Sequence, residues 1–192
     1  SGKVNETTAV HHGSCFFYVD YPFYPEEQFR NICLPLHKTT VMKIAVFPGS
    51  FDPITRGHES ILRRAIPLFD KIIVAVGVNS DKSGYFPVEK RLEWLNQTFS
   101  DLPQVSVESY NGLTVDFCNK VGASYILRGL RTSADFEFER GVAQVNLKLE
   151  SDVETVFMLA LPEYVMVTSS IVREVHKHGG NIDQFIPEAI VI

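Results

Sequence analysis

The sequence predicts an α/β fold in which five parallel strands form one doubly wound sheet. From Met42 onward, short apolar runs alternate with amphipathic stretches of helical spacing, which is typical of a parallel sheet with crossover helices. The chain of 192 residues is long enough for one well-buried domain but short for two. Its residues are 45% hydrophobic and 21% charged, close to the globular average, so a disordered, collagen-like or coiled-coil chain fits poorly.

Five short apolar runs are the expected strands, and the first two are the clearest. KIAVF at residues 43–47 and KIIVAVGV at residues 71–78 are almost continuously apolar, as strands buried on both faces are. The other expected strands are residues 105–109, 125–127 and 155–161. Right-handed crossovers would bring the carboxyl ends of all five strands to one edge of the sheet, where ligands of such sheets bind.

Amphipathic stretches between these runs are the expected helices. They are residues 59–69, a stretch that begins after Pro87, residues 114–121, residues 133–149 and a stretch that begins near Ser169. Pro67 should distort or end the last turn of the first helix, and Gly122 should stop the third. In the longest helix, Phe136 and Phe138 are interpreted as packing residues. One stripe at helical spacing comprises Phe138, Val142, Val145 and Leu149.

Residues 1–41 are interpreted as an N-terminal extension that precedes a domain at residues 42–192. This stretch is rich in aromatic residues but has no clear helical or alternating period. Three origins remain open: a remnant of cloning, a start misassigned upstream of Met42, or a segment that packs on a neighbouring molecule.

Net charge, apolar runs and cysteine content argue against several classes of protein. The net charge of −5 gives a long nucleic acid no general electrostatic attraction. No apolar run approaches the roughly 20 residues that span a bilayer, and no basic region followed by an apolar stretch marks secretion. Three cysteines without a C-x-x-C pair predict neither a disulfide framework nor a four-thiolate metal site. We therefore expect a cytoplasmic protein with reduced thiols and no nucleic-acid or membrane partner.

A glycine-containing motif, PGSFDPITRGH at residues 48–58, directly follows the first expected strand. It is neither the G-x-G-x-x-G fingerprint nor a Walker A loop. Gly49 permits close backbone approach, Ser50 offers a hydroxyl and an N–H, and His58 stands at a helix start, where the dipole favours anions. Ordinary turn and capping chemistry would explain each residue singly, but the combination predicts an anion-binding site of a Rossmann-like fold.

A second candidate anion site is the TSSIVR motif at residues 168–173, which places adjacent hydroxyls at a helix start and a guanidinium one turn later. The alternative is that Ser169 or Ser170 only caps the helix and that Arg173 is a solvated surface residue. Two such helix starts that both follow parallel strands favour binding of phosphates.

These two motifs resemble those of the nucleotidyltransferases that carry (H/T)-x-G-H near the start and an S-S-x-x-R-like motif near the end. Within that superfamily the sequence is most similar to the phosphopantetheine adenylyltransferase family. The similarity is carried by GSFDPIT-x-GH at residues 49–58 and by ILRGLR at residues 126–131, followed by ADFE-x-E at residues 134–139. It extends in order from Met42 to about Pro187.

The resemblance implies transfer of the adenylyl group of ATP to 4′-phosphopantetheine, which gives dephospho-coenzyme A and pyrophosphate in the penultimate step of coenzyme A synthesis. In-line attack of one phosphate on another needs no covalent enzyme intermediate; it needs alignment and neutralisation of charge.

By the same resemblance, three residues would carry the catalysis. His58 would stabilise the transition state through the α-phosphate, Ser50 would bind ATP and orient the acceptor, and Lys82 would contact the reacting phosphates. The family commonly has threonine at Ser50, whose hydroxyl keeps the same role. Arg128 would hold the acceptor phosphate, and Thr114 would lie beside the pantetheine arm. Lys82 taken alone is as well explained as a solvated loop lysine.

The resemblance also assigns an ATP-binding set that extends over three segments. Its members are Ser50, Phe51, His58, Gly129, Leu130, Arg131, Glu139, Tyr164, Val165, Met166, Val167, Thr168, Ser169 and Ser170. Arg128 and Arg131 are followed by acidic residues at positions 135, 137 and 139, so an ion-pair network is an alternative to binding of substrate.

No carboxylate pair or His/Cys cluster predicts a dedicated metal site, so we expect Mg²⁺ to be held mainly by the phosphates of ATP. The resemblance further implies a homo-oligomer, a hexamer in that family, and coenzyme A as a feedback inhibitor.

Three other functions fit the sequence less well. A different nucleotidyltransferase, acting on nicotinamide mononucleotide or glycerol phosphate, would not be expected to carry the block at residues 126–139. A catalytically silent nucleotide-binding module would lack His58, Lys82 or Arg128, and all three are present. A nucleic-acid-binding domain is disfavoured by the acidic balance.

Overall fold

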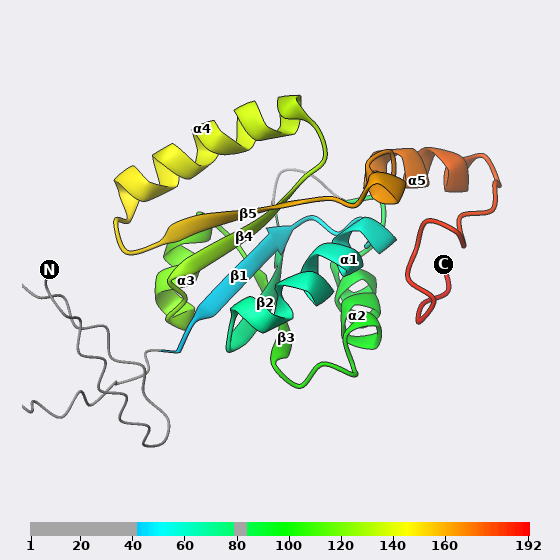
Figure 1. The fold of residues 1–192 in the computed structure, drawn as a ribbon. Helices are drawn as coiled ribbons and strands as arrows, with labels where there is room; N and C mark the ends of the chain where they lie inside the picture. The colour runs from blue at the N-terminus through cyan, green and yellow to red at the C-terminus, as the bar shows by residue number, and fades with distance from the viewer. Residues whose placement is uncertain (1–41, 79–83) are drawn as a thin grey trace, which may run out of the picture. The chain divides into compact units, whose positions relative to one another are not determined.

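The computed structural model describes residues 42–78 and 84–192, and the elements below belong to these residues. In chain order they are β1 Ile44–Gly49, α1 Arg56–Ala65, the 3₁₀ helix η2 Ile66–Leu68, β2 Lys71–Gly77, α2 Val88–Thr98, β3 Val105–Tyr110, α3 Thr114–Val121, β4 Tyr125–Leu130, α4 Ser133–Leu149, β5 Glu154–Leu159, the 3₁₀ helix η3 Pro162–Tyr164 and α5 Ser169–Lys177 (Figure 1). The expected extension, residues 1–41, lies outside the described residues.

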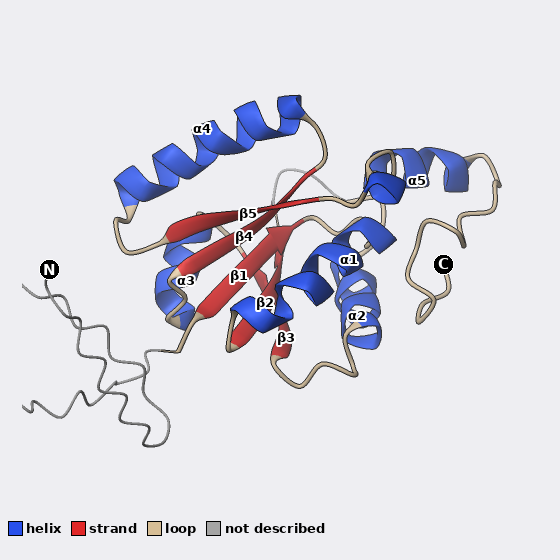
Figure 2. Ribbon diagram, viewed as in Figure 1, coloured by secondary structure: helices blue, strands red, loops and turns tan. Residues whose placement is uncertain are grey.

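The five strands form one parallel sheet in the order β3-β2-β1-β4-β5, which confirms the expected architecture. The chain winds outward from β1 to β3, crosses back, and then builds β4 and β5 on the other side of β1. Figure 2 shows the strands as one layer between helices. The point where the winding direction reverses, between β1 and β4, is where ligands of such sheets bind.

Alternate residues of the central strands supply two apolar cores, because successive side chains of a strand point to opposite faces. On one face, Ala45 and Phe47 pack with residues of α1, α2 and α5. On the other face, Val46 packs with Val115 and Cys118 of α3. The strand interior is therefore buried on both sides, as its continuous apolar run predicted.

β1 and β4 separate toward their carboxyl ends. β1 pairs with β2 along its whole length, but with β4 only at Ala45 and Val46. Pro48 has no N–H to offer, and its carbonyl accepts from the side chain of Arg128 over 2.6 Å. The divergence opens the sheet at the switch point, where the motif after β1 begins.

The boundaries of α1 and β4 differ from the expected ones in ways that affect the site. α1 begins three residues earlier than expected, at Arg56, and ends at Ala65, because Pro67 lies in the separate turn η2. β4 continues through Leu130, so that Arg128 belongs to the strand and not to a following loop.

The apolar stripe of α4 is exposed among the described residues, and the packing expected of Phe138 is not observed. No residue of α4 is buried, and Phe138 and Val145 are 71% and 58% exposed. Phe136, interpreted as a packing residue, contacts Phe157 edge to face at 6.0 Å between ring centroids but is 40% exposed. Periodicity identified a helix with an apolar stripe but not the surface that the stripe contacts.

Candidate active site

A cavity of about 450 Å³ opens at the carboxyl ends of β1 and β4. Three segments that are distant in sequence line it: the turn after β1 with the start of α1, the end of β4 with the first turns of α4, and the segment that leads from β5 into α5. Its polar lining comprises Ser50, Thr55, His58, Arg128, Arg131, Asp135, Glu139, Tyr164, Thr168, Ser169, Ser170 and Arg173. Both motifs identified in the sequence thus face one cavity.

A second cavity, of about 210 Å³, adjoins the first. The two share Pro48, Gly49, Ser50, Arg128 and Glu139 as lining residues. The smaller cavity extends past Thr114, whose hydroxyl lies 2.8 Å from that of Tyr110, to the apolar side chains of Phe138 and Val142 on α4. Its walls are therefore more apolar than those of the larger cavity.

The turn that carries Ser50 is held from two helices. Nη1 of Arg91, on α2, donates to the Ser50 carbonyl over 2.8 Å, and Nη1 of Arg173, on α5, donates to the Asp52 carbonyl. The Asp52 carboxylate accepts from the backbone amides of Tyr85 and Phe86 at 2.7 and 2.9 Å. These bonds fix the position of the Ser50 hydroxyl at the cavity wall.

Phe51, inside this turn, has a φ of +44°, a conformation that non-glycine residues rarely adopt. Its side chain is buried and packs edge to face against Phe47 and His58, with ring centroids 5.5 and 5.2 Å away. The packing over-determines the turn and compensates for the unfavourable backbone angle.

His58 is the third residue of α1, whose N-cap is Thr55, so it stands at the helix start as expected. Its Nδ1 accepts a hydrogen bond from the Thr55 backbone amide over 3.1 Å, so the neutral ring carries its proton on Nε2. Burial, together with the positive charges of Arg131 and Arg128, lowers the pKa of His58 to about 4. The ring therefore enters the cavity as a neutral N–H donor.

Arg128 and Glu139 form a two-point ion pair between β4 and α4. Nε of Arg128 lies 2.9 Å from Oε2 of Glu139, and Nη2 bonds Oε1. Because Nη1 bonds the Pro48 carbonyl, the guanidinium is fixed at three points beside the wall that the two cavities share.

Arg131, in the loop after β4, forms a similar pair with Asp135, which lies one turn before Glu139 on α4. Nε and Nη2 of Arg131 lie 2.9 and 3.1 Å from the two carboxylate oxygens of Asp135. Burial pushes the pKa of Asp135 upward, but the hydrogen bonds from Arg131 outweigh it, so this pKa lies below its usual range. The acidic residues at positions 135 and 139 therefore form the ion pairs that were the alternative to binding of substrate. Arg128 and Arg131 nevertheless line the larger cavity.

The start of α5 is capped by Thr168, whose side chain accepts from the backbone amide of Ile171 over 3.1 Å. Ser169 donates to the Pro53 carbonyl over 2.8 Å and so ties this helix to the motif after β1. Nη2 of Arg173 donates to the Ser170 hydroxyl over 3.1 Å. The alternative in which Ser169 or Ser170 is the cap and Arg173 is solvated is wrong.

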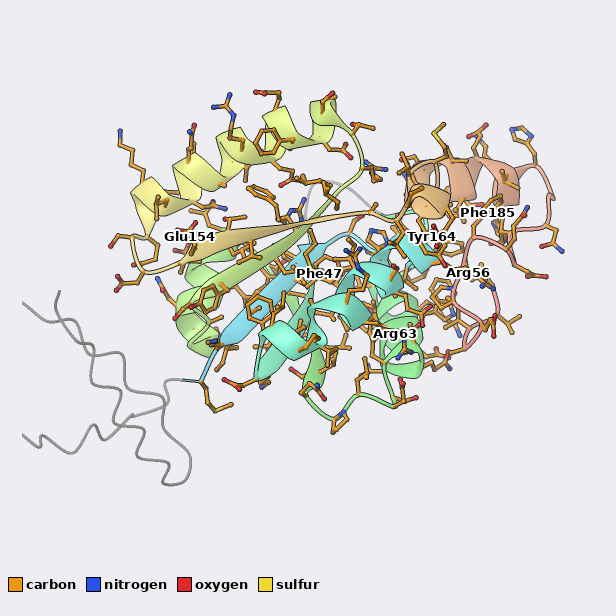
Figure 3. The ribbon with its side chains drawn as sticks, viewed as in Figure 1. Phe47, Arg56, Arg63, Glu154, Tyr164 and Phe185 are labelled. Carbon is orange, nitrogen blue, oxygen red and sulfur yellow. The ribbon has the colours of Figure 1, made fainter. Side chains whose placement is uncertain are left out.

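Figure 3 places Tyr164 at the junction that leads into α5, close to α1, and Arg56 beside the C-terminal segment. The backbone amide and Nε of Arg56 donate to the carbonyls of Phe185 and Ile186, both over 2.9 Å. The C-terminal segment thus anchors the amino end of α1 at Arg56, two residues before His58.

The structure brings most sequence-assigned site residues to the two cavities, with four exceptions among the described residues. Phe51 and Leu130 are buried and line neither cavity, and neither do Val165 and Met166, the latter 75% exposed. Lys82 lies outside the described residues. The roles that the resemblance gave to these five residues stay predictions.

Arg91, which lines neither cavity but holds the turn that carries Ser50, was not identified from the sequence. It is 5% exposed and lies on α2 with Val88 and Leu95 at helical spacing. Its place on the apolar stripe of α2 could have indicated a structural role. An arginine is rarely buried unless it has a defined partner.

Within residues 42–78 and 84–192, no three His, Cys, Asp or Glu side chains gather as metal ligands would. Over the same residues, no helix is both long enough and apolar enough to cross a membrane.

Comparison with known proteins agrees with this geometry. The cytidylyltransferase-like family model matches residues 46–175. The phosphopantetheine adenylyltransferase of Flavobacterium psychrophilum is 52% identical over 149 residues, which are 78% of this chain and 98% of that protein. That of Cytophaga hutchinsonii is 44% identical over 148 residues, 77% of this chain and 99% of that protein.

Among solved structures, a bifunctional NMN adenylyltransferase/ADP ribose pyrophosphatase from Francisella tularensis matches with a TM-score of 0.61 at 15% identity, covering 78% of this chain and 46% of that one. At this identity the likeness shows the fold alone. The similarity to the curated relatives extends over nearly their whole length, and the chain therefore belongs to the phosphopantetheine adenylyltransferase family.

Proposed function

We propose that this protein transfers the adenylyl group of ATP to 4′-phosphopantetheine, with release of dephospho-coenzyme A and pyrophosphate. The observation that carries the proposal is the shared wall of the two cavities. ATP would occupy the larger, more polar cavity, and the pantetheine arm would extend into the smaller cavity past Thr114. The acceptor phosphate and the α-phosphate of ATP would then meet beside Ser50 and Arg128.

Contact between these two phosphates requires nearby positive charge and hydrogen-bond donors held in fixed positions. Two unit anions about 4 Å apart repel by roughly 1 kcal/mol in water and by roughly 4 kcal/mol near a protein surface. The guanidinium of Arg128 would offset this repulsion at the acceptor phosphate, and the Nε2–H of His58 would donate to the α-phosphate as negative charge accumulates there. No side chain has to act as a nucleophile, because the acceptor phosphate attacks phosphorus directly.

We expect Mg²⁺ to enter this site bound to ATP, and not to be held there by the protein alone. The two carboxylates that line the larger cavity, Asp135 and Glu139, are bonded to arginines, so the triphosphate and water would hold the ion. When bound, it would neutralise part of the phosphate charge.

The test is to supply ATP and Mg²⁺ with each candidate acceptor in turn and to measure release of pyrophosphate. We expect release with 4′-phosphopantetheine and none with nicotinamide mononucleotide or glycerol phosphate. Release with one of the other acceptors, and not with phosphopantetheine, would overturn the proposed substrate.

We also propose that the protein works as a homo-oligomer, a hexamer by analogy with the family. The exposed stripe on α4 supports self-association, because a row of large apolar side chains in water is unfavourable unless another surface covers it. Coenzyme A, which is the product with one further phosphate, would compete for both cavities as a feedback inhibitor. The cytoplasm, where ATP is present and a free thiol such as that of Cys118 stays reduced, is the compartment that fits these substrates.

A further inference from the structure

Two ion pairs join α4 to the chain at the end of β4, Arg128 with Glu139 and Arg131 with Asp135, and they differ in which cavity they border. Arg128 and Glu139 line both cavities, whereas Arg131 and Asp135 line only the larger one. Asp135 and Glu139 are four residues apart on α4, so they lie about one turn apart on the same helix face. α4 therefore presents one carboxylate to each arginine.

Neither carboxylate is suited to contact a phosphate directly, because like charges repel. Both oxygens of Glu139 accept from Arg128, and both oxygens of Asp135 accept from Arg131. A planar guanidinium bonded at two points to a carboxylate has a fixed orientation. The ion pair therefore fixes the directions of the remaining N–H groups of the arginine, because the side chain no longer rotates freely.

We propose that Glu139 and Asp135 are positioning residues with divided roles: Glu139 orients Arg128 toward the acceptor phosphate, and Asp135 orients Arg131 toward the phosphates of the nucleotide. This inference rests on the proposed function for the identity of the two anions. It also departs from the resemblance, which assigned Glu139 to ATP. Each carboxylate would act on binding of one substrate through its own arginine.

The test compares Glu139→Gln with Asp135→Asn, since each substitution keeps the shape of the side chain and removes the charge. For Glu139→Gln we expect the KM for phosphopantetheine to rise about tenfold and the KM for ATP to change less than about twofold. For Asp135→Asn we expect the reverse pattern. A merely structural role would move both constants together.

The matched control is Glu137→Gln. Glu137 lies on the same helix between the two carboxylates, is exposed, and pairs with Arg140 away from both cavities. We expect both constants of this variant to equal those of the native protein. A rise in both constants for either Glu139→Gln or Asp135→Asn, or no rise in either, would overturn the division of roles.

A double variant separates action through the arginine from direct action. If Glu139 acts through Arg128, adding Glu139→Gln to Arg128→Lys should raise the acceptor KM no further; an additive increase would contradict the proposal. Failure of the proposed function is seen separately, because the native protein would then release no pyrophosphate with phosphopantetheine. Calorimetric titration of ATP into native protein and Asp135→Asn would still test the Arg131 pair, and equal affinities would count against it.

Discussion

The backbone amide of Thr55 donates to Nδ1 of His58 over 3.1 Å. The Thr55 hydroxyl oxygen also lies 2.9 Å from this nitrogen. The bond from the amide sets the chemistry of the imidazole, since a nitrogen that accepts an N–H carries no proton of its own. The proton of the neutral ring is then on Nε2. Thr55, the N-cap of α1, and His58 thus form a capping box, in which a histidine takes the place usually held by glutamate or glutamine.

His58→Ala removes this donor and should lower kcat by about 100-fold or more, because a donor aimed at developing charge acts mainly in the transition state. The affinity for ATP and the circular dichroism spectrum should remain close to native. Steady-state kinetics and calorimetry measure the two effects. His178→Ala, at an exposed histidine bonded to Glu174, is the control and should keep native turnover. Near-native kcat for His58→Ala would remove His58 from the mechanism.

The pKa of His58, about 4 against 6.5 in a free side chain, gives a pH dependence of stability. Between pH 6.5 and 4 the unfolded chain binds a proton at this residue and the folded chain does not, so the free energy of unfolding decreases as the pH falls. At pH 5 this residue should account for a loss of about 2 kcal/mol relative to pH 7. Denaturant unfolding of native protein and His58→Gln at both pH values measures the difference.

Nuclear magnetic resonance checks the same property directly. The ring of His58 should show no titration between pH 6 and 8 and should have the chemical shifts of the Nε2–H tautomer. A midpoint near 6.5 would contradict both the desolvation of this ring and the stability difference expected for His58→Gln.

The sequence allowed the sheet and the meeting of the two motifs to be predicted, for physical reasons that particular elements show. β1 and β2 are continuous apolar runs, and only a strand buried on both faces needs that pattern. Once the strands are parallel, their carboxyl ends share one edge, so Ser50, His58 and Ser169 had to lie near one another.

Other features depend on how elements pack, which a periodic pattern does not encode. The stripe of α4 has the spacing of a core helix, yet Leu149 is 57% exposed, because spacing alone does not specify which surface covers a stripe. Whether Arg128 would pair with Asp135, Glu137 or Glu139 depended on the placement of α4 over β4. Arg91 was missed because its partner is a backbone carbonyl, and no sequence pattern marks that acceptor.

Arg91→Met should impair catalysis without touching a substrate. Its guanidinium holds the Ser50 carbonyl from the buried side of the turn, so its loss should let the Ser50 hydroxyl move and should lower kcat/KM by about tenfold. The control is Lys90→Met, at an exposed neighbour that pairs with Glu93. If Arg91→Met retains native kcat/KM while its melting temperature falls, Arg91 only stabilises the fold.

Cys118 should be chemically inert in the folded protein. Burial raises the pKa of its thiol to about 11, so almost no thiolate is present at neutral pH. In a Cys15→Ser/Cys33→Ser background, iodoacetamide should leave Cys118 unmodified in native buffer and should alkylate it in denaturant, as read by mass spectrometry. Rapid alkylation in native buffer would mean that the core under α3 opens to solvent.

The stripe on α4 should determine the assembly state. Val145 and Leu149 are 58% and 57% exposed and line neither cavity, so substitution there should leave the active site of a protomer intact. A charge buried in an apolar contact is strongly unfavourable. Val145→Asp should therefore shift the particle mass, measured by light scattering after gel filtration, from that of an oligomer to that of a smaller species. Leu68→Asp, at an exposed leucine of η2, is the control for an added charge elsewhere and should keep the native mass. A native mass equal to one protomer, or an unchanged oligomer in Val145→Asp, would show that this stripe is not the contact.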